Sequence, residues 1–442
     1  MASLAGRLPP KLRQMTSFQM TWAVLALVWG SLMAAWQWPL LQLSDQGILA
    51  IAPGFVVYLL VLTLGIGGFL AMTGLPRERT VESKNIGRIA RLDHLRFFAA
   101  SLVILYHYFG KIIPFDQNRR NIVFNMMTEG SSGVDIFFVL SGFIFGMIGY
   151  EKKIRYFDFI RSRVVRIYPL YLFAILLILG THAERFLPLD SVLLLFPIFI
   201  VGYLFALPGF GQLWTIGLEF QFYLIFPFLA AFLNRNGYRY LIGVLALAIG
   251  LRALYYTELG SVKNLSYGSL PGRIDQFLMG IAAAWLYIRK REAFSNPLNL
   301  LVGAALALAS FQWLVAWNAV GTGTNSPLWI VWPTINGTVW AYFVLSYISC
   351  RVPIPSFLDR TLTNLGALSF SLYVMHNFAV DWSLKYAASL TITGQPDTDA
   401  ALKGLFICIP FAVLISWATY HLIEKQFFIY RRKYVEPIEA ST

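Results

Sequence analysis

The chain has 442 residues, of which 57% are hydrophobic, 16% aromatic and only 13% charged. This charged fraction is about half that of ordinary soluble domains, which excludes a soluble globular protein and indicates a polytopic membrane protein. The formal net charge of +13 comes from basic residues in short loops between apolar segments, a distribution typical of membrane topology rather than of nucleic-acid binding. Cys350 and Cys408 lack metal-type spacing, so neither a disulfide framework nor a zinc site is expected.

Apolar runs of near-bilayer length recur along the chain. The first, 21–43, is too long and too rich in Trp for a signal peptide, so a retained span is expected there, and a second span follows at 48–73. Further helices are expected at 92–112, 133–150, 167–180, 191–207, 213–233, 240–256, 273–288, 298–320, 327–350, 365–384 and 401–423. The short runs 167–180 and 191–207 are split by Pro188 and are expected to supply one crossing together.

The basic loops predict the orientation of the chain, because cytoplasmic loops collect Lys and Arg. If 167–233 crosses twice, both termini and the basic loops face the cytoplasm. Together, these segments hold 25 of the 35 Lys and Arg residues. We therefore predict an all-α polytopic membrane protein of about twelve transmembrane helices. The expected parts are a cytoplasmic tail with two spans in 1–90, a membrane domain in 91–427 and a cytoplasmic tail in 428–442.

Ionisable residues inside the predicted spans are candidates for function, because a charge at the bilayer centre costs about 2.5–3.5 kcal/mol. The run RLDHLRFFAASLVILYH contains Asp93, Arg96 and His107. Eleven residues separate Arg96 from His107, which is about 16 Å along a helix and nearly the same face. One helix is thus expected to join a cation at the cytoplasmic end to an imidazole in the outer half, although a lone histidine in a span is about as often a packing residue.

Two further runs carry charge near the ends of predicted spans. In GVDIFFVLSGFIFG, Asp135 opens a span whose small residues are typical of close helix packing. In RSRVVRIYPLY, three arginines lie at a cytoplasmic helix start, where guanidinium groups and the positive helix dipole bind phosphate. The positive-inside rule alone explains Arg161, but Arg163 and Arg166 close to it also suit a nucleotide-bearing ligand such as coenzyme A.

The C-terminal half supplies the remaining candidates. LWTIGLEFQFY places Glu219 in a span near Trp214, and a carboxylate beside His107 would raise its basicity and fix its tautomer. Alternatively, Glu219 forms an interhelical salt bridge with Arg273 of GRIDQFLMG. His376 of SLYVMHNF lies in the middle of a span and is expected to line the same cavity.

In this order, the runs resemble the type-three membrane acyltransferase family, whose members transfer acyl groups to hydroxyls of saccharides and related acceptors. The resemblance extends over 91–427 and is most specific in LDHLRFFAASLVILYH and GVDIFFVLSGF. RIYPLY, LWTIGLEFQFY, RIDQFLMG and SLYVMH support it. It implies a ten-helix acyltransferase core in 91–427, to which the two N-terminal spans are an addition.

The resemblance also implies roles for individual residues. His107 would be the essential catalytic histidine, with Glu219 and Asp135 as its candidate catalytic partners. The acyl-CoA donor would be bound by three arginines, Arg96, Arg163 and Arg166. Further residues expected in the substrate cavity are Asp93, Trp214, Arg273, Asp275 and His376. No metal and no permanently bound cofactor are expected.

The expected function is an O-acyltransferase of a bacterial inner membrane. It would move an acyl group, acetyl by resemblance, from cytoplasmic acyl-CoA to a saccharide, glycolipid or polysaccharide acceptor. His107 would act as a general base or form an acyl-histidine, and the sequence leaves both routes open. The alternative function is a transporter or flippase for a lipid-linked or saccharide substrate, which the lack of two matching halves disfavours.

Overall fold

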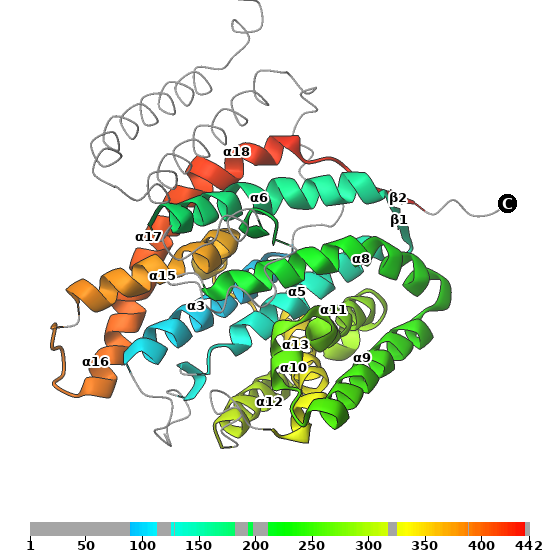
Figure 1. Cartoon of the computed structure of the whole chain (residues 1–442), viewed down its shortest axis with the longest axis horizontal. Coiled ribbons are helices and arrows are strands. Elements are labelled where there is room, and N and C mark those ends of the chain that lie inside the picture. The colour runs from blue at the N-terminus through cyan, green and yellow to red at the C-terminus, as the bar shows by residue number, and fades with distance from the viewer. Residues whose placement is uncertain are drawn as a thin grey trace, which may run out of the picture. The chain divides into compact units, whose positions relative to one another are not determined.

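The computed structural model describes residues 89–112, 125–127, 129–181, 193–197, 211–316, 325–387 and 389–437. The two spans expected at 21–43 and 48–73 lie outside these residues, and so does most of the run at 191–207. Within the described part, the chain is helical apart from one short two-stranded sheet, as the predicted all-α class requires (Figure 1).

The elements have the following bounds. The longer helices are α3 (Ala90–Ile112), α5 (Ser132–Gly149), α6 (Tyr156–Thr181), α8 (Trp214–Asn236), α9 (Tyr238–Leu259), α11 (Leu270–Lys290), α12 (Pro297–Ala316), α13 (Trp332–Ser349), α14 (Ser356–Ala367), α15 (Ser369–Tyr386) and α17 (Ile409–Thr419). The shorter helical segments are α10 (Lys263–Gly268), α16 (Pro396–Lys403), α18 (Lys425–Phe427), four 3-10 turns, η5 (Gly211–Leu213), η6 (Arg291–Phe294), η7 (Pro327–Ile330) and η10 (Phe428–Tyr430), and two π-helical turns, η8 (Gly404–Cys408) and η9 (Tyr420–Glu424). Strand β1 (Lys152–Ile154) pairs antiparallel with β2 (Val435–Pro437).

The described chain divides into two compact units. The smaller holds Gln426–Arg431 and the described part of Val164–Phe196. In it, the Tyr168 hydroxyl donates to the Leu195 carbonyl over 2.7 Å. The larger unit holds the described residues of Ser83–Arg163, Pro197–Lys425 and Arg432–Thr442, and therefore most of the bundle.

Helix α11 lies at the centre of the larger unit, where it packs against α5, α13 and α9 (Figure 1). Glycines allow α5 and α11 to approach closely. A Cβ at Gly142 would lie 2.0 Å from the Phe277 carbonyl oxygen, and a Cβ at Gly280 would lie 2.1 Å from that of Val139. Because the two helices run in parallel, the polar residues at the start of α5 meet those at the start of α11.

Helix α3 lies between two groups of helices. Leu95, Ala99 and Leu102 join the apolar core formed with α5, α11, α12 and α13. Residues on the other side, among them Ile104 and Tyr108, pack with α15, η8 and α17. This position explains why α3 is buried along most of its length although it carries charged residues near both ends.

Six helices in the described part are long and apolar enough to cross a membrane, which makes this a multi-pass membrane protein. They are Ser132–Gly149, Tyr156–Leu179, Gly211–Asn236, Tyr238–Leu259, Pro297–Leu314 and Pro396–Tyr430. The predicted count of about twelve is therefore not established. Helices α3, α11, α13 and α15 have 18 to 23 residues but are more polar. Several of their polar side chains are buried against other helices, where a polar group costs less than in lipid.

The prediction for 167–180 is wrong in one respect. Helix α6 begins at Tyr156 and has 26 residues, so it is long enough to cross without help from 191–207. The basic stretch before Ile167 continues the helix, because Arg is a good helix former and its long side chain can reach polar surroundings from an apolar segment. Pro169 lies inside the helix without ending it.

Candidate active site

His107 lies near the end of α3, and its imidazole is partly accessible. Its Nδ1 lies 2.9 Å from the carbonyl oxygen of Val103, one turn earlier. Because a carbonyl oxygen only accepts hydrogen bonds, Nδ1 of the neutral ring carries the proton and donates it. The nitrogen with a free electron pair is therefore Nε2, which is the arrangement that a general base requires.

A second histidine contacts His107 directly. His376 of α15 has its Nε2 3.2 Å from Nδ1 of His107, and the two ring centroids are 4.8 Å apart. His376 has no exposed surface, and its Nδ1 lies 2.8 Å from the carbonyl oxygen of Tyr373. Both histidines were candidates from the sequence, and the fold brings them into contact across 269 positions.

Arg96 and Asp93 form an ion pair at the opposite end of α3. Arg96 Nη1 donates to Asp93 Oδ1 over 2.8 Å, and the Arg96 side chain is 28% exposed. Since α3 is continuous from Ala90 to Ile112, the separation of Arg96 and His107 along the axis is about 16 Å, as the spacing predicts.

Arg163 of α6 lies among aromatic rings. Its guanidinium carbon is 5.5 to 5.9 Å from the ring centroids of Phe145, Phe159, Tyr223 and Tyr434. Nη2 donates to the Tyr434 hydroxyl over 3.1 Å, whereas Nε is buried without a partner in the described part of the chain. Rings stabilise a cation less than a carboxylate does, so the positive charge of Arg163 is only partly compensated by these neighbours.

Arg166 follows one turn later on α6 and belongs to the smaller unit. Its guanidinium lies 5.9 Å from the Phe428 ring, and no ion pair with a carboxylate forms among the described residues. Arg166 therefore resembles Arg163 in being a cation whose observed neighbour is an aromatic ring.

Glu219 is engaged away from His107. Its Oε1 accepts hydrogen bonds from Ser141 Oγ over 3.0 Å and from the Tyr223 hydroxyl. The bond from Ser141 links α8 to α5, whereas Tyr223 lies one turn later on α8 itself. Glu219 was expected to orient His107, but no hydrogen bond between the two is found among the described residues. The carboxylate faces α5, whereas the imidazole faces α15.

Asp135 is also engaged elsewhere. It accepts hydrogen bonds from Arg273, from Gln276 over 2.8 Å and from Asn336, and it is 5% exposed. The partner of Arg273 is thus Asp135 rather than Glu219, because the close parallel packing of α5 and α11 brings their first turns together. These bonds hold α5, α11 and α13 together, and none of them involves His107.

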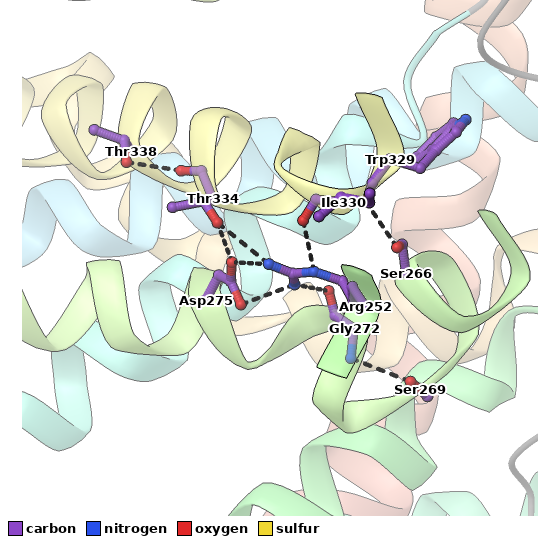
Figure 2. A network of polar contacts seen from close by, with 9 residues as sticks. All are labelled: Arg252, Ser266, Ser269, Gly272, Asp275, Trp329, Ile330, Thr334 and Thr338. Atoms are coloured by element: carbon purple, nitrogen blue, oxygen red, sulfur yellow. Dashed lines mark hydrogen bonds and ion pairs between the residues drawn. The ribbon is translucent and has the colours of Figure 1, made fainter. Parts of the chain in front are cut away.

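Asp275 has no exposed surface and lies in a polar network with Arg252, which is likewise fully buried (Figure 2). Arg252 of α9 donates to both of its oxygens over 3.0 and 2.7 Å, and Thr334 of α13 donates to one of them. Arg252 also donates to the carbonyls of Ile330 and Gly272 over 2.7 and 3.1 Å. Asp275 was expected to line a substrate cavity. Instead, both of its oxygens are bonded to protein, and these bonds join α9, α11 and α13.

Trp214 begins α8 and is only 5% exposed. Its ring is 5.1 Å from that of Tyr267, which in turn lies 4.4 Å from the Arg273 guanidinium. Packing against Tyr267 leaves little of the Trp214 surface for a sugar ring. Tyr267 is the more accessible of the two aromatic side chains.

Two residues of interest were missed in the sequence. Arg252 was assigned to an apolar span, and only its helical spacing within α9 could have indicated an inward side chain. Glu129 precedes α5, is 7% exposed, and its Oε2 lacks a hydrogen-bond partner among the described residues. Burial raises the pKa of Glu129 to about 7, while the Lys263 ammonium opposes this shift. Its position in a loop gave no indication of burial.

A cavity of about 350 Å³ lies between α3, α13 and α14. His94, Phe98 and Ser101 line it from α3. By helical spacing these residues are on the face of α3 opposite His107, so this cavity does not hold the reacting groups. Within the described residues, no cluster of three or more His, Cys, Asp or Glu could hold a metal ion.

Comparisons with known proteins place these features in a family. Residues 89–421 match the model of a family described as an acyltransferase domain. The chain is similar to "Putative O-acetyltransferase SACOL0978" of Staphylococcus aureus (strain COL), with 25% identity over 381 residues, 78% of this chain and 58% of that protein. It is also similar to "O-acetyltransferase OatA" of Staphylococcus aureus (strain NCTC 8325 / PS 47), with 27% identity over 222 residues, 44% of this chain and 34% of that protein. No solved structure matches the chain.

The six candidate spans make this chain a multi-pass membrane protein. The family match extends over most of the chain, so the protein belongs to the acyltransferase family. It spans about half the length of the first curated relative.

Proposed function

We propose that this protein is an integral-membrane O-acyltransferase that moves an acyl group, acetyl by preference, from acyl-CoA to a hydroxyl of a saccharide or glycolipid. The observation that carries the proposal is the 2.9 Å contact between His107 Nδ1 and the Val103 carbonyl oxygen, from which we infer that Nδ1 carries the proton and Nε2 is free to accept one. The family match supports acyl transfer as the reaction. The names of the relatives support a hydroxyl as the acceptor and acetyl as the transferred group.

The reaction needs one proton to move twice. Nε2 of His107 takes the proton of the acceptor hydroxyl as its oxygen attacks the thioester carbonyl carbon. The carbon–sulfur bond then breaks, and the departing thiolate takes the proton from the imidazolium to give free CoA and the ester. His107 returns to its starting tautomer, so no metal or other cofactor is consumed.

The donor is proposed to bind by its phosphates. Arg163 supports this because its guanidinium is held by rings and its Nε lacks a described partner, which leaves a cation available to a phosphate oxygen. Arg166 and Arg96 are proposed to contribute further positive charge. The axial distance of about 16 Å between Arg96 and His107 is comparable to an extended pantetheine arm, which would carry the thioester to the imidazole.

The membrane arrangement is proposed from the charge of the loops. Basic loops and both termini would face the cytoplasm of a bacterial inner membrane, where acyl-CoA is present. His107 lies near the other end of α3, so the acceptor would enter from the outer side. This arrangement separates the binding of donor and acceptor.

The test is release of free CoA by the purified protein in nanodiscs, with acetyl-CoA as donor and oligosaccharides as acceptors. An acyltransferase releases CoA only when an acceptor is present and forms an acylated sugar in equal amount. A transporter or flippase would leave acetyl-CoA intact, so absence of CoA release with every acceptor class would reject the proposal.

A further inference from the structure

The contact between His107 and His376 has a defined proton arrangement. Nδ1 of His107 lies 2.9 Å from the Val103 carbonyl oxygen, and Nδ1 of His376 lies 2.8 Å from the Tyr373 carbonyl oxygen. Both carbonyls are acceptors only, so each neutral ring carries its proton on Nδ1. Nε2 of His376 then presents an electron pair, and it lies 3.2 Å from the Nδ1 proton donor of His107. The His107 proton is thus shared between a carbonyl and an imidazole.

This arrangement matters when His107 becomes charged. On taking a proton at Nε2, His107 becomes an imidazolium whose Nδ1 already donates to Nε2 of His376. Hydrogen bonds from a charged donor are roughly twice as strong as neutral ones, so the contact strengthens when the charge forms. In serine proteases a buried carboxylate accepts the equivalent bond from the catalytic histidine. Here the two carboxylates expected as catalytic partners, Glu219 and Asp135, are bonded to other residues.

Burial favours the neutral form of His376, in which Nε2 accepts a hydrogen bond while Nδ1 donates one. The side chain has no exposed surface, and a second positive charge 3.2 Å from an imidazolium would be repelled. Its ring is also fixed in place, because Tyr373 one turn earlier donates to the Gln212 carbonyl over 2.8 Å and Gln212 donates to the Val374 carbonyl over 3.0 Å. The turn of α15 that carries His376 is thereby tied to η5.

We propose that His376 is a positioning residue that fixes the reactive tautomer of His107 and stabilises its imidazolium as a neutral hydrogen-bond acceptor. This inference rests on the proposed acyl transfer. It assigns to a buried histidine the function for which a carboxylate was expected. It also predicts which property of residue 376 matters, namely an acceptor atom at the position of Nε2.

The experiment compares three variants in CoA release. His376→Leu removes the acceptor atom and keeps much of the volume, whereas His376→Gln places an amide oxygen near the position of Nε2. Met375→Leu is the matched control, because it changes a neighbouring buried side chain of the same turn and alters no hydrogen-bonding nitrogen or oxygen atom. Thermal unfolding in detergent reports whether each variant is folded.

His376→Leu should lower kcat about 10- to 100-fold, the effect expected for a lost hydrogen bond to a charged group, with an unchanged KM for acetyl-CoA. His376→Gln should recover most of that loss, and Met375→Leu should behave as the parent. A folded His376→Leu variant with parental kcat would overturn the inference, and so would a folded His376→Gln variant as slow as His376→Leu. Should His376→Leu fail to fold, a folded His376→Gln variant whose kcat is about 10- to 100-fold below the parental value would overturn the inference. If the parent itself released no CoA with any acceptor, the proposed function would fail instead.

Discussion

Replacing Asp275 by Asn should destabilise the bundle strongly. The Arg252 guanidinium and the Asp275 carboxylate both lack exposed surface and are joined by two hydrogen bonds of 3.0 and 2.7 Å (Figure 2). Asn has nearly the same shape as Asp but no charge, so the substitution leaves the Arg252 cation buried without a counterion. Breaking a buried pair in this way costs about 3–5 kcal/mol of unfolding free energy.

The contacts that remain set the order of the variants. In Asp275→Asn, Arg252 still donates to the Ile330 and Gly272 carbonyls, so the loss should lie near the lower limit. In Arg252→Met, the carboxylate retains only the Thr334 hydroxyl, and the loss should lie near the upper limit. The double variant removes both buried charges of this network and should differ from the parent by only about 1–2 kcal/mol.

The assay is thermal unfolding of the purified variants in detergent, combined with acyl transfer at low temperature. Asp275→Asn should lower Tm by about 3–5 °C, while kcat stays at the parental value because this network does not contact His107. An unchanged Tm would refute the reasoning, and so would a double variant as unstable as the two single variants. A folded Asp275→Asn variant with a strongly reduced kcat would instead support the expectation that Asp275 lines the substrate cavity.

The remaining predictions concern the donor, pH and packing. Arg163→Met keeps the contacts with the rings but removes the cation, so it should raise the KM for acyl-CoA about tenfold and leave the acceptor KM unchanged. Arg161→Ala is the control, and equal KM values for acyl-CoA in both variants would contradict the assignment. The raised pKa of Glu129 means that the folded state binds a proton more tightly than the unfolded chain, so this contribution to stability is present below pH 4.5 and is lost as pH rises through about 7. Glu129→Gln should remove that decline, on the order of 3 kcal/mol in unfolding measured from pH 4.5 to about pH 8, and a pH slope identical to that of the parent would refute the burial argument. Gly142→Ala would place a Cβ 2.0 Å from the Phe277 carbonyl oxygen and should cost about 1–3 kcal/mol, so a parental Tm would contradict the close packing.

The sequence predicted individual helices better than contacts between them. The helix expected at 92–112 is observed as Ala90–Ile112, because an uninterrupted run of that length without Pro or Gly before Gly110 favours one continuous helix. The helix expected at 167–180 begins at Tyr156 instead, because its start was placed by the apolar run alone, although arginines prolong an apolar helix.

The candidate site shows where reasoning from one sequence stops. His107 and His376 were both found as polar residues in apolar spans, but their contact depends on which faces of α3 and α15 meet. The same limit applies to Asp135 and Arg273, which pair because small residues bring α5 and α11 together. Hydropathy indicates which residues are costly in lipid, whereas their partners follow from packing between distant segments.

The central claim is that the His107 imidazole activates an alcohol for acylation. Its most direct test is mass spectrometry of surface glycans from cells that lack the gene and are complemented with the parent chain or with His107→Ala, at matched levels of folded protein in the membrane. The account predicts an acyl-sized mass on the glycans with the parent chain and none with His107→Ala. Equal acylation by both chains would contradict it.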